Sequence, residues 1–96
     1  MQTLISATAD GSGDAIQESR GDDLRITGTV YVTGTLDGAT AGIEVSPDGI
    51  NWVRPTSLAF TTMAAENIEY HCKAYRGYVA GAGANTNVTV QLAYGW

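Results

Sequence analysis

Polar and apolar residues alternate over residues 24–36, which is the clearest pattern in the chain. One parity carries aliphatic residues and glycine, and the other carries Arg25, Thr27, Thr29, Tyr31, Thr33 and Thr35. Because successive side chains of a strand point to opposite faces, this pattern predicts one long strand with an apolar face and a hydroxyl-rich face.

Shorter segments of the same kind predict the remaining strands, at 3–8, 15–19, 41–46, 51–54, 58–62, 66–74 and 88–96. Residues 75–80 are expected to extend the 66–74 strand past a bend at Gly77, and residues 63–65 leave one helical turn open as an alternative. In the 41–46 strand we expect Ile43 and Val45 to point inward and Glu44 outward.

Turn residues separate these segments. Asp37-Gly38 stands between two alternating runs and predicts a hairpin. Residues 46–49 (Ser-Pro-Asp-Gly) predict a second turn, since proline presets its own φ and glycine accepts a positive φ. Short strands joined by tight turns favour an all-β fold, an antiparallel β-sandwich of jelly-roll or Ig-like type, with a small barrel as the alternative. At 96 residues, the chain is expected to form one domain, 1–96.

Charge and composition narrow the function classes. Ten acidic residues against five basic ones give a net charge of −5, and Lys73 is the single lysine. Nucleic-acid binding is not expected, because phosphate backbones require clustered Lys and Arg. No apolar run approaches a membrane-spanning length and residues 1–10 do not resemble a signal peptide, so neither membrane insertion nor secretion is expected. One cysteine fits a reducing cytoplasm.

Acidic residues all lie at or before Glu69. Chance accounts for this in a short chain. The alternative is that the domain has ends of different charge, which would suit head-to-tail packing between copies.

The pair of residues that most resembles a catalytic nucleophile and its base is Cys72 and His71. Adjacent residues of a strand point to opposite faces, so the pair does not meet the hydrogen-bond distance that such catalysis needs. Cys72 is expected to be a small buried side chain and His71 to face solvent or a partner. No enzyme activity and no cofactor are expected.

Residues 10–14 resemble the first half of a calcium-binding loop, but Ala15 and Gly21 stand where such a loop needs glycine and glutamate. A solvated acidic loop is the simpler interpretation. An irregular carboxylate site is the alternative, drawing on Asp10, Asp14, Asp22 or Asp23. With one histidine and one cysteine, a zinc site is not expected.

The threonine row of the long strand is polar without charge, which is ordinarily a solvated sheet face. The alternative is a protein-contact face, because tyrosine favours interfaces and charged residues are depleted at their cores. The contact residues proposed on this basis are Thr29, Tyr31, Thr33, Tyr78 and Trp96.

Residues 34–40 (GTLDGAT), 43–49 (IEVSPDG) and Trp52 resemble a hairpin of small virion proteins of tailed bacteriophages. Two later segments continue the resemblance, 75–83 (YRGYVAGAG) and 88–92 (VTVQL). Ser46-x-Asp48-Gly49-x-x-Trp52 also resembles the Asp-box hairpin of sialidase-like propellers, but one residue is missing before the glycine and the motif occurs once. A turn followed by a core or interface tryptophan is sufficient to explain it.

The phage resemblance covers about the last two thirds of the chain. It implies a β-sandwich present in many copies on a particle, with residues 1–23 either as short strands or as an arm that inserts into a neighbour. The expected function is a non-enzymatic bacteriophage virion structural protein, a capsid cement or decoration protein that binds across capsid subunits. Its expected partners are the major capsid protein or other virion proteins, with homo-oligomers, and its expected location is the virion, assembled in the bacterial cytoplasm. Alternatives are a tail, knob or fibre module and a carbohydrate-binding module with Trp52, Tyr75 or Tyr78 as stacking platforms.

Overall fold

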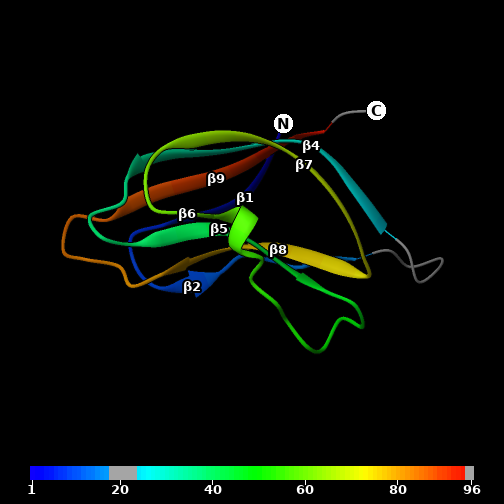
Figure 1. The fold of residues 1–96 in the computed structure, drawn as a ribbon. Coiled ribbons are helices and arrows are strands. Elements are labelled where there is room, and N and C mark those ends of the chain that lie inside the picture. The colour runs from blue at the N-terminus through cyan, green and yellow to red at the C-terminus, as the bar shows by residue number, and fades with distance from the viewer. Residues whose placement is uncertain (18–23, 95–96) are drawn as a thin grey trace.

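Two antiparallel β-sheets form the molecule in a computed structural model that describes residues 1–17 and 24–94 (Figure 1). Sheet A has four strands in the order β1-β9-β4-β7, and sheet B has the order β2-β8-β5-β6, with β3 also paired to β8. The elements are β1 (Gln2–Ala7), β2 (Gly11–Ser12), β3 (Ile16–Gln17), β4 (Leu24–Thr35), β5 (Thr40–Ser46), the 3-10 turn η1 (Thr56–Leu58), β6 (Ala59–Phe60), β7 (Ala64–Cys72), β8 (Ala74–Ala80) and β9 (Asn87–Tyr94).

The core lies between the sheets. Its largest fully buried aliphatic side chains come from both layers: Ile26, Val30, Val32, Val88, Val90 and Leu92 of sheet A, and Ile43, Leu58 and Val79 of sheet B and the adjoining η1. The predicted all-β antiparallel sandwich is therefore confirmed. Within the described residues, no helix is long and apolar enough to cross a membrane.

The long strand is confirmed as β4. Its apolar parity faces the core, where Ile26, Val30 and Val32 are buried, and its threonine parity faces out. The opening strand is confirmed as β1. The predicted 15–19 strand is confirmed only as the two residues of β3, and its end lies outside the described residues, as do Gly21, Asp22 and Asp23.

The hairpin predicted at Asp37-Gly38 is wrong. The turn forms, with positive φ at both residues and a 2.9 Å hydrogen bond from the Ala39 amide to the Leu36 carbonyl, but β4 and β5 belong to different sheets. Leu36 and Ala39 are both buried, so the chain turns across the core rather than within one sheet.

The strand predicted over 66–80 is two strands. β7 belongs to sheet A and β8 to sheet B, and the break falls at Lys73 rather than at Gly77, which lies within β8. The Lys73 amide donates to the Ser46 carbonyl at 2.8 Å, which fixes the crossing to the end of β5. The helical turn considered for residues 63–65 is wrong, because Ala64 and Ala65 begin β7.

The segment between β5 and β6 differs most from expectation. Instead of a strand over 51–54, a single bridge joins Val53 to Val45, with amide–carbonyl distances of 2.8 and 2.9 Å. Pro55 then precedes η1, and the predicted 58–62 strand shortens to β6. Val53 therefore lies beside β5 at its edge, and the Arg54 side chain reaches Glu44 on the outer side of the strand, where Gly42, Glu44 and Ser46 are buried.

Candidate functional site

The outer side of sheet A is a broad polar surface built from all four strands. We call it the hydroxyl face, and its members are Thr3 and Ser6 of β1, Thr89 and Gln91 of β9, Thr27, Thr29, Tyr31 and Thr33 of β4, and Asn67 of β7. Among the described side chains its centre carries no charge, and Glu69 and His71 lie towards one end of β7.

Strand register places three of the predicted contact residues together at the centre of this face. Tyr31 lies between Gln91 of β9 and Ala65 of β7, with Thr29 and Thr33 two residues away on either side. Tyr31 is half-buried by these neighbours and Thr33 is exposed.

Side-chain hydrogen bonds tie the hydroxyl face together across the strands. Thr29 donates to the Asn67 carbonyl oxygen at 2.8 Å, Gln91 donates to Thr3 at 3.3 Å, and the hydroxyls of Ser6 and Thr89 are 3.2 Å apart. Such cross-strand pairs fix the rotamers of polar side chains that would otherwise be free, so the surface is partly preorganised.

The other two predicted contact residues are not part of this face. Tyr78 lies on the outer side of sheet B, where its side chain is only 2% exposed and the Arg54 guanidinium lies 4.3 Å from its ring centroid. Trp96 lies outside the described residues.

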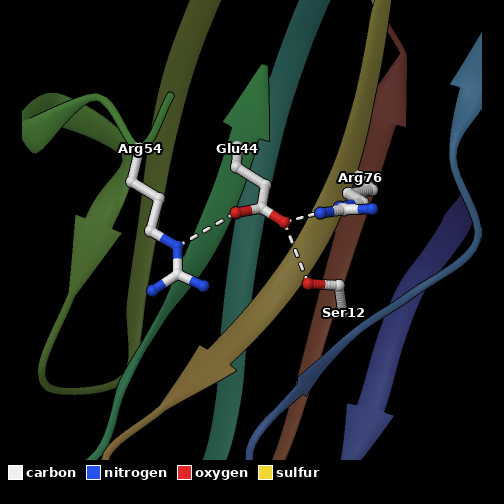
Figure 2. Close-up of polar contacts among 4 residues, drawn as sticks. All are labelled: Ser12, Glu44, Arg54 and Arg76. Atoms are coloured by element: carbon white, nitrogen blue, oxygen red, sulfur yellow. Dashed lines mark hydrogen bonds and ion pairs between the residues drawn. The ribbon is translucent and has the colours of Figure 1, made fainter. Parts of the chain in front are cut away.

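A polar cluster on the outer side of sheet B was not foreseen. Figure 2 shows its centre, the Glu44 carboxylate, which receives Nε of Arg54 at 2.9 Å, Nε of Arg76 at 2.5 Å and Oγ of Ser12 at 2.9 Å. Glu44 points outward from sheet B, as its parity predicts, yet it is only 2% exposed. The strand pattern gives a side chain's direction but not what lies over it.

Two aromatic rings complete this group, which we call the Glu44 cluster. Arg76 stacks on Trp52 at 3.9 Å from the ring centroid, as Arg54 does on Tyr78. Both contacts are cation–π interactions and leave each guanidinium held between a carboxylate and a ring. Since Trp52 and Arg54 belong to the segment after β5, the cluster fastens that segment to sheet B.

The electrostatics of Glu44 follow from this geometry. Burial by itself would raise the pKa of its carboxyl group, but the hydrogen bonds from Arg54, Arg76 and Ser12 outweigh burial and lower the pKa below its ordinary value of 4.5. Glu44 is therefore ionised at neutral pH, and one carboxylate faces two guanidinium groups.

The predicted turn at 46–49 is confirmed, and several side-chain hydrogen bonds hold it. Asp48 Oδ1 accepts the amides of Ile50 and Asn51, both at 2.8 Å, and Ser46 Oγ accepts the Gly49 amide at 2.7 Å. These amide hydrogen bonds hold the pKa of Asp48 far below its usual range. The turn needs all of these groups for its own shape, and it leads directly into Trp52.

The groups considered for chemistry do not converge. Cys72 is buried and His71 exposed, on opposite faces of β7. Asp10 accepts the Ala82 amide at 2.7 Å and so fastens the loop before β9. In the described part of the chain no three metal-ligating side chains gather, and no pocket is present.

The rings considered as sugar platforms are largely covered. Tyr75 and Tyr78 are buried, and Trp52 carries Arg76 on its ring. Tyr75 and Tyr78 therefore offer no face to a sugar.

Taken together, the described residues define an antiparallel β-sandwich with one hydroxyl-bearing outer face, uncharged at its centre, and a second outer face where the segment after β5 is fastened. Comparisons of the chain with protein-family models, with curated proteins and with solved structures gave no match.

Proposed function

We propose that this protein is a non-enzymatic structural component of a tailed-bacteriophage virion, and that it serves as a capsid cement or decoration protein. The observation that carries the proposal is the hydroxyl face, which is uncharged at its centre and spans the four strands of sheet A. The resemblance of residues 34–52 and 75–92 to small virion proteins supports it further.

The physical argument concerns desolvation. Burying a charge without a partner is costly, whereas a hydroxyl or amide can exchange its water for a hydrogen bond to a neighbouring protein. A centre made of Thr29, Tyr31 and Thr33 therefore suits close contact with another protein surface. Tyrosine adds a large contact area with little loss of side-chain freedom.

In this proposal the sandwich lies over joints between capsid subunits, with the hydroxyl face against the shell. The contact at each joint is modest, and repetition over many joints resists the internal pressure of the packaged genome. The interior of the sandwich takes no part, since its side chains hold the two sheets together.

Binding to capsids tests the proposal. Purified protein is mixed with DNA-free and with mature capsids that lack it, and the bound fraction is measured by sedimentation. We expect saturable binding, weakened about tenfold or more by Thr33→Lys, because the new charge would have to be desolvated.

The matched control is Thr56→Lys, which adds the same charge at an exposed threonine of η1. It should bind as the unmodified protein does. Absence of binding to capsids in every maturation state refutes the decoration role. If Thr33→Lys and Thr56→Lys lose capsid binding to the same extent, the hydroxyl face is not the contact surface.

A further inference from the structure

Arg54 and Arg76 of the Glu44 cluster use only part of their hydrogen-bonding capacity inside the protein. A guanidinium group donates from Nε and also from its Nη1 and Nη2 atoms. Figure 2 shows that Nε of each arginine is turned towards Glu44, at 2.9 Å for Arg54 and 2.5 Å for Arg76. Among the described residues, the Nη atoms of both arginines donate to no other group of the protein. Two guanidinium groups therefore keep these donors for an acceptor from outside.

Both guanidinium groups are held in place, yet solvent reaches them. The Arg54 side chain is 49% exposed and the Arg76 side chain 28% exposed, whereas that of Glu44 is 3% exposed. The Tyr78 ring lies against Arg54 and the Trp52 ring against Arg76. Because a ring and a carboxylate together fix each arginine, little side-chain freedom remains to be lost when a ligand binds.

The charges of the Glu44 cluster are not balanced. One carboxylate, that of Glu44, faces two guanidinium groups. Asp10 is also influenced by Arg54, but its pKa is lowered mainly by hydrogen bonds from the amides of Ala82 and Gly81, with a smaller contribution from the Arg54 charge. In the described structure Asp10 accepts the Ala82 amide and forms no ion pair with Arg54. One further carboxylate would therefore match the charge of the cluster.

Carboxylate is the ligand chemistry that fits these donors. The Nη1 and Nη2 atoms of a guanidinium group lie side by side and can bind the two oxygens of a carboxylate together. No pocket is present in the part of the chain that the structure describes, so the ligand has to lie along the surface, as a peptide segment does. Nucleic acid fits poorly, because its phosphate backbone requires more clustered basic residues than a chain with a net charge of −5 provides.

We propose that the Glu44 cluster binds an acidic segment of a neighbouring protein, with an Asp or Glu carboxylate of that segment accepting hydrogen bonds from the Nη atoms of Arg54 and Arg76. The cluster lies on the outer side of sheet B, and the hydroxyl face lies on the outer side of sheet A. The inference goes beyond the proposed function and does not depend on it. It gives the sandwich a second contact surface on its opposite side.

The test uses the full-length protein labelled with ¹⁵N and a blocked hexapeptide that alternates glutamate and serine. The peptide is added up to about 5 mM at constant ionic strength, to cover dissociation constants of about 1 mM. We expect saturable shifts of the Nε–H signals of Arg54 and Arg76 and of the Trp52 indole N–H signal. The amide signals of Thr29 and Gln91, on the hydroxyl face, should not move. A peptide with glutamine in place of glutamate should bind about tenfold more weakly or worse.

Two variants separate guanidinium geometry from net charge. Arg54→Lys keeps the positive charge but loses the planar pair of donors, and should weaken binding of the glutamate peptide about tenfold. Lys73→Gln removes a positive charge between β7 and β8, outside the cluster, and should change the affinity less than about twofold. Far-UV circular dichroism checks that Arg54→Lys is folded. If it is not, the comparison of the two peptides on the unmodified protein still decides.

Inorganic phosphate at the same ionic strength distinguishes the remaining ligand class. The inference is overturned if the glutamate and glutamine peptides bind equally, if folded Arg54→Lys binds as tightly as the unmodified protein, or if the shifts fall on the hydroxyl face. It is also overturned if phosphate binds the same arginines more tightly than the glutamate peptide does.

Failure of this inference is distinct from failure of the proposed function. Thr33→Lys, on the opposite side of the sandwich, should leave the affinity for the glutamate peptide unchanged. Peptide binding without capsid binding would refute the decoration role alone, and capsid binding without peptide binding would refute the acidic-segment site alone.

Discussion

Glu44 joins four parts of the chain through one carboxylate: β2, β5, β8 and the segment that follows β5. Its position is unusual for an acidic residue, because it is shielded from water on the outer side of a sheet. A buried ion pair contributes little net free energy compared with a well-packed apolar substitute, but removing one partner leaves the other groups unpaired. Replacing one carboxylate oxygen of Glu44 is therefore expected to have a large effect on the stability of the fold.

For Glu44→Gln we expect a loss of about 2–4 kcal/mol in the free energy of unfolding at pH 7, measured by urea denaturation. The amide keeps the shape of the side chain but no longer offsets Arg54 and Arg76. Arg54→Gln should cost less, because the Arg54 side chain is 49% exposed and water can replace its contacts. Equal losses for the two variants would contradict the central role of Glu44.

The same variant should alter the dependence of stability on pH. The pKa of Glu44 is lower in the folded protein than its ordinary value of 4.5, so its carboxylate stabilises the fold above that pH and this contribution is lost as the pH falls below it. The unfolding free energy of Glu44→Gln should therefore fall less steeply from pH 5 towards pH 2. The pKa values of Asp10 and Asp48 are also lowered in the folded protein, so part of the decrease in unfolding free energy at low pH should remain in the variant. An unchanged slope would contradict this assignment.

For single residues, the sequence predicts well which way a side chain points and predicts poorly what surrounds that side chain. Parity placed Ile26 and Val30 in the core and Thr29, Tyr31 and Thr33 on the opposite face, as the structure has them. It also gave Glu44 the correct direction. It could not show that the segment after β5 would cover that residue, because such coverage depends on contacts with Trp52 and Arg54 further along the chain.

Among the elements, β5 and the segment from Pro47 to Leu58 form the part that local rules describe least well. The segment approaches β5 closely at Gly42, where a Cβ atom would lie 1.8 Å from the Leu58 carbonyl oxygen. Only glycine permits this approach, which brings the end of η1 against β5 at the point where β6 pairs with it.

Gly42→Ala should accordingly lower the free energy of unfolding by about 2–4 kcal/mol, because a backbone carbonyl must move to admit the methyl group. The matched control is Gly11→Ala in β2, where an added Cβ would meet nothing within 4 Å. That change should stay within about 0.5 kcal/mol. Thermal unfolding of the two variants measures the difference, and a Gly42→Ala protein as stable as Gly11→Ala would contradict the close approach.

Prediction from turn residues has a similar limit for the arrangement of strands. Asp37-Gly38 has the residues of a two-residue turn, and the chain does reverse there. A turn specifies the reversal but not the partner of the next strand. That partner was set by Leu36 and Ala39, whose burial leads the chain into the opposite sheet.

Across the whole molecule, strands distant in sequence pair with one another. β1 pairs with β9, and the connections β4–β5, β6–β7, β7–β8 and β8–β9 each pass from one sheet to the other. Neither sheet can therefore form before most of the chain is in place. This arrangement favours a single cooperative transition and slow closure of long loops.

We expect equilibrium unfolding curves from tryptophan fluorescence and far-UV circular dichroism to coincide. Stopped-flow refolding should take milliseconds to seconds, the range of sandwiches dominated by non-local pairs. Separate transitions for the two probes, or refolding within about 100 microseconds, would contradict this description.

The pairing of the first and last strands has a practical consequence for engineering. Gln2 stands opposite Leu92, so the start of β1 and the end of β9 lie side by side. A short flexible linker could join them, and new ends could be opened at an exposed bend such as Ala84-Asn85. A circular permutant of this design would keep every strand pair while moving any fused cargo to the opposite end of the sandwich.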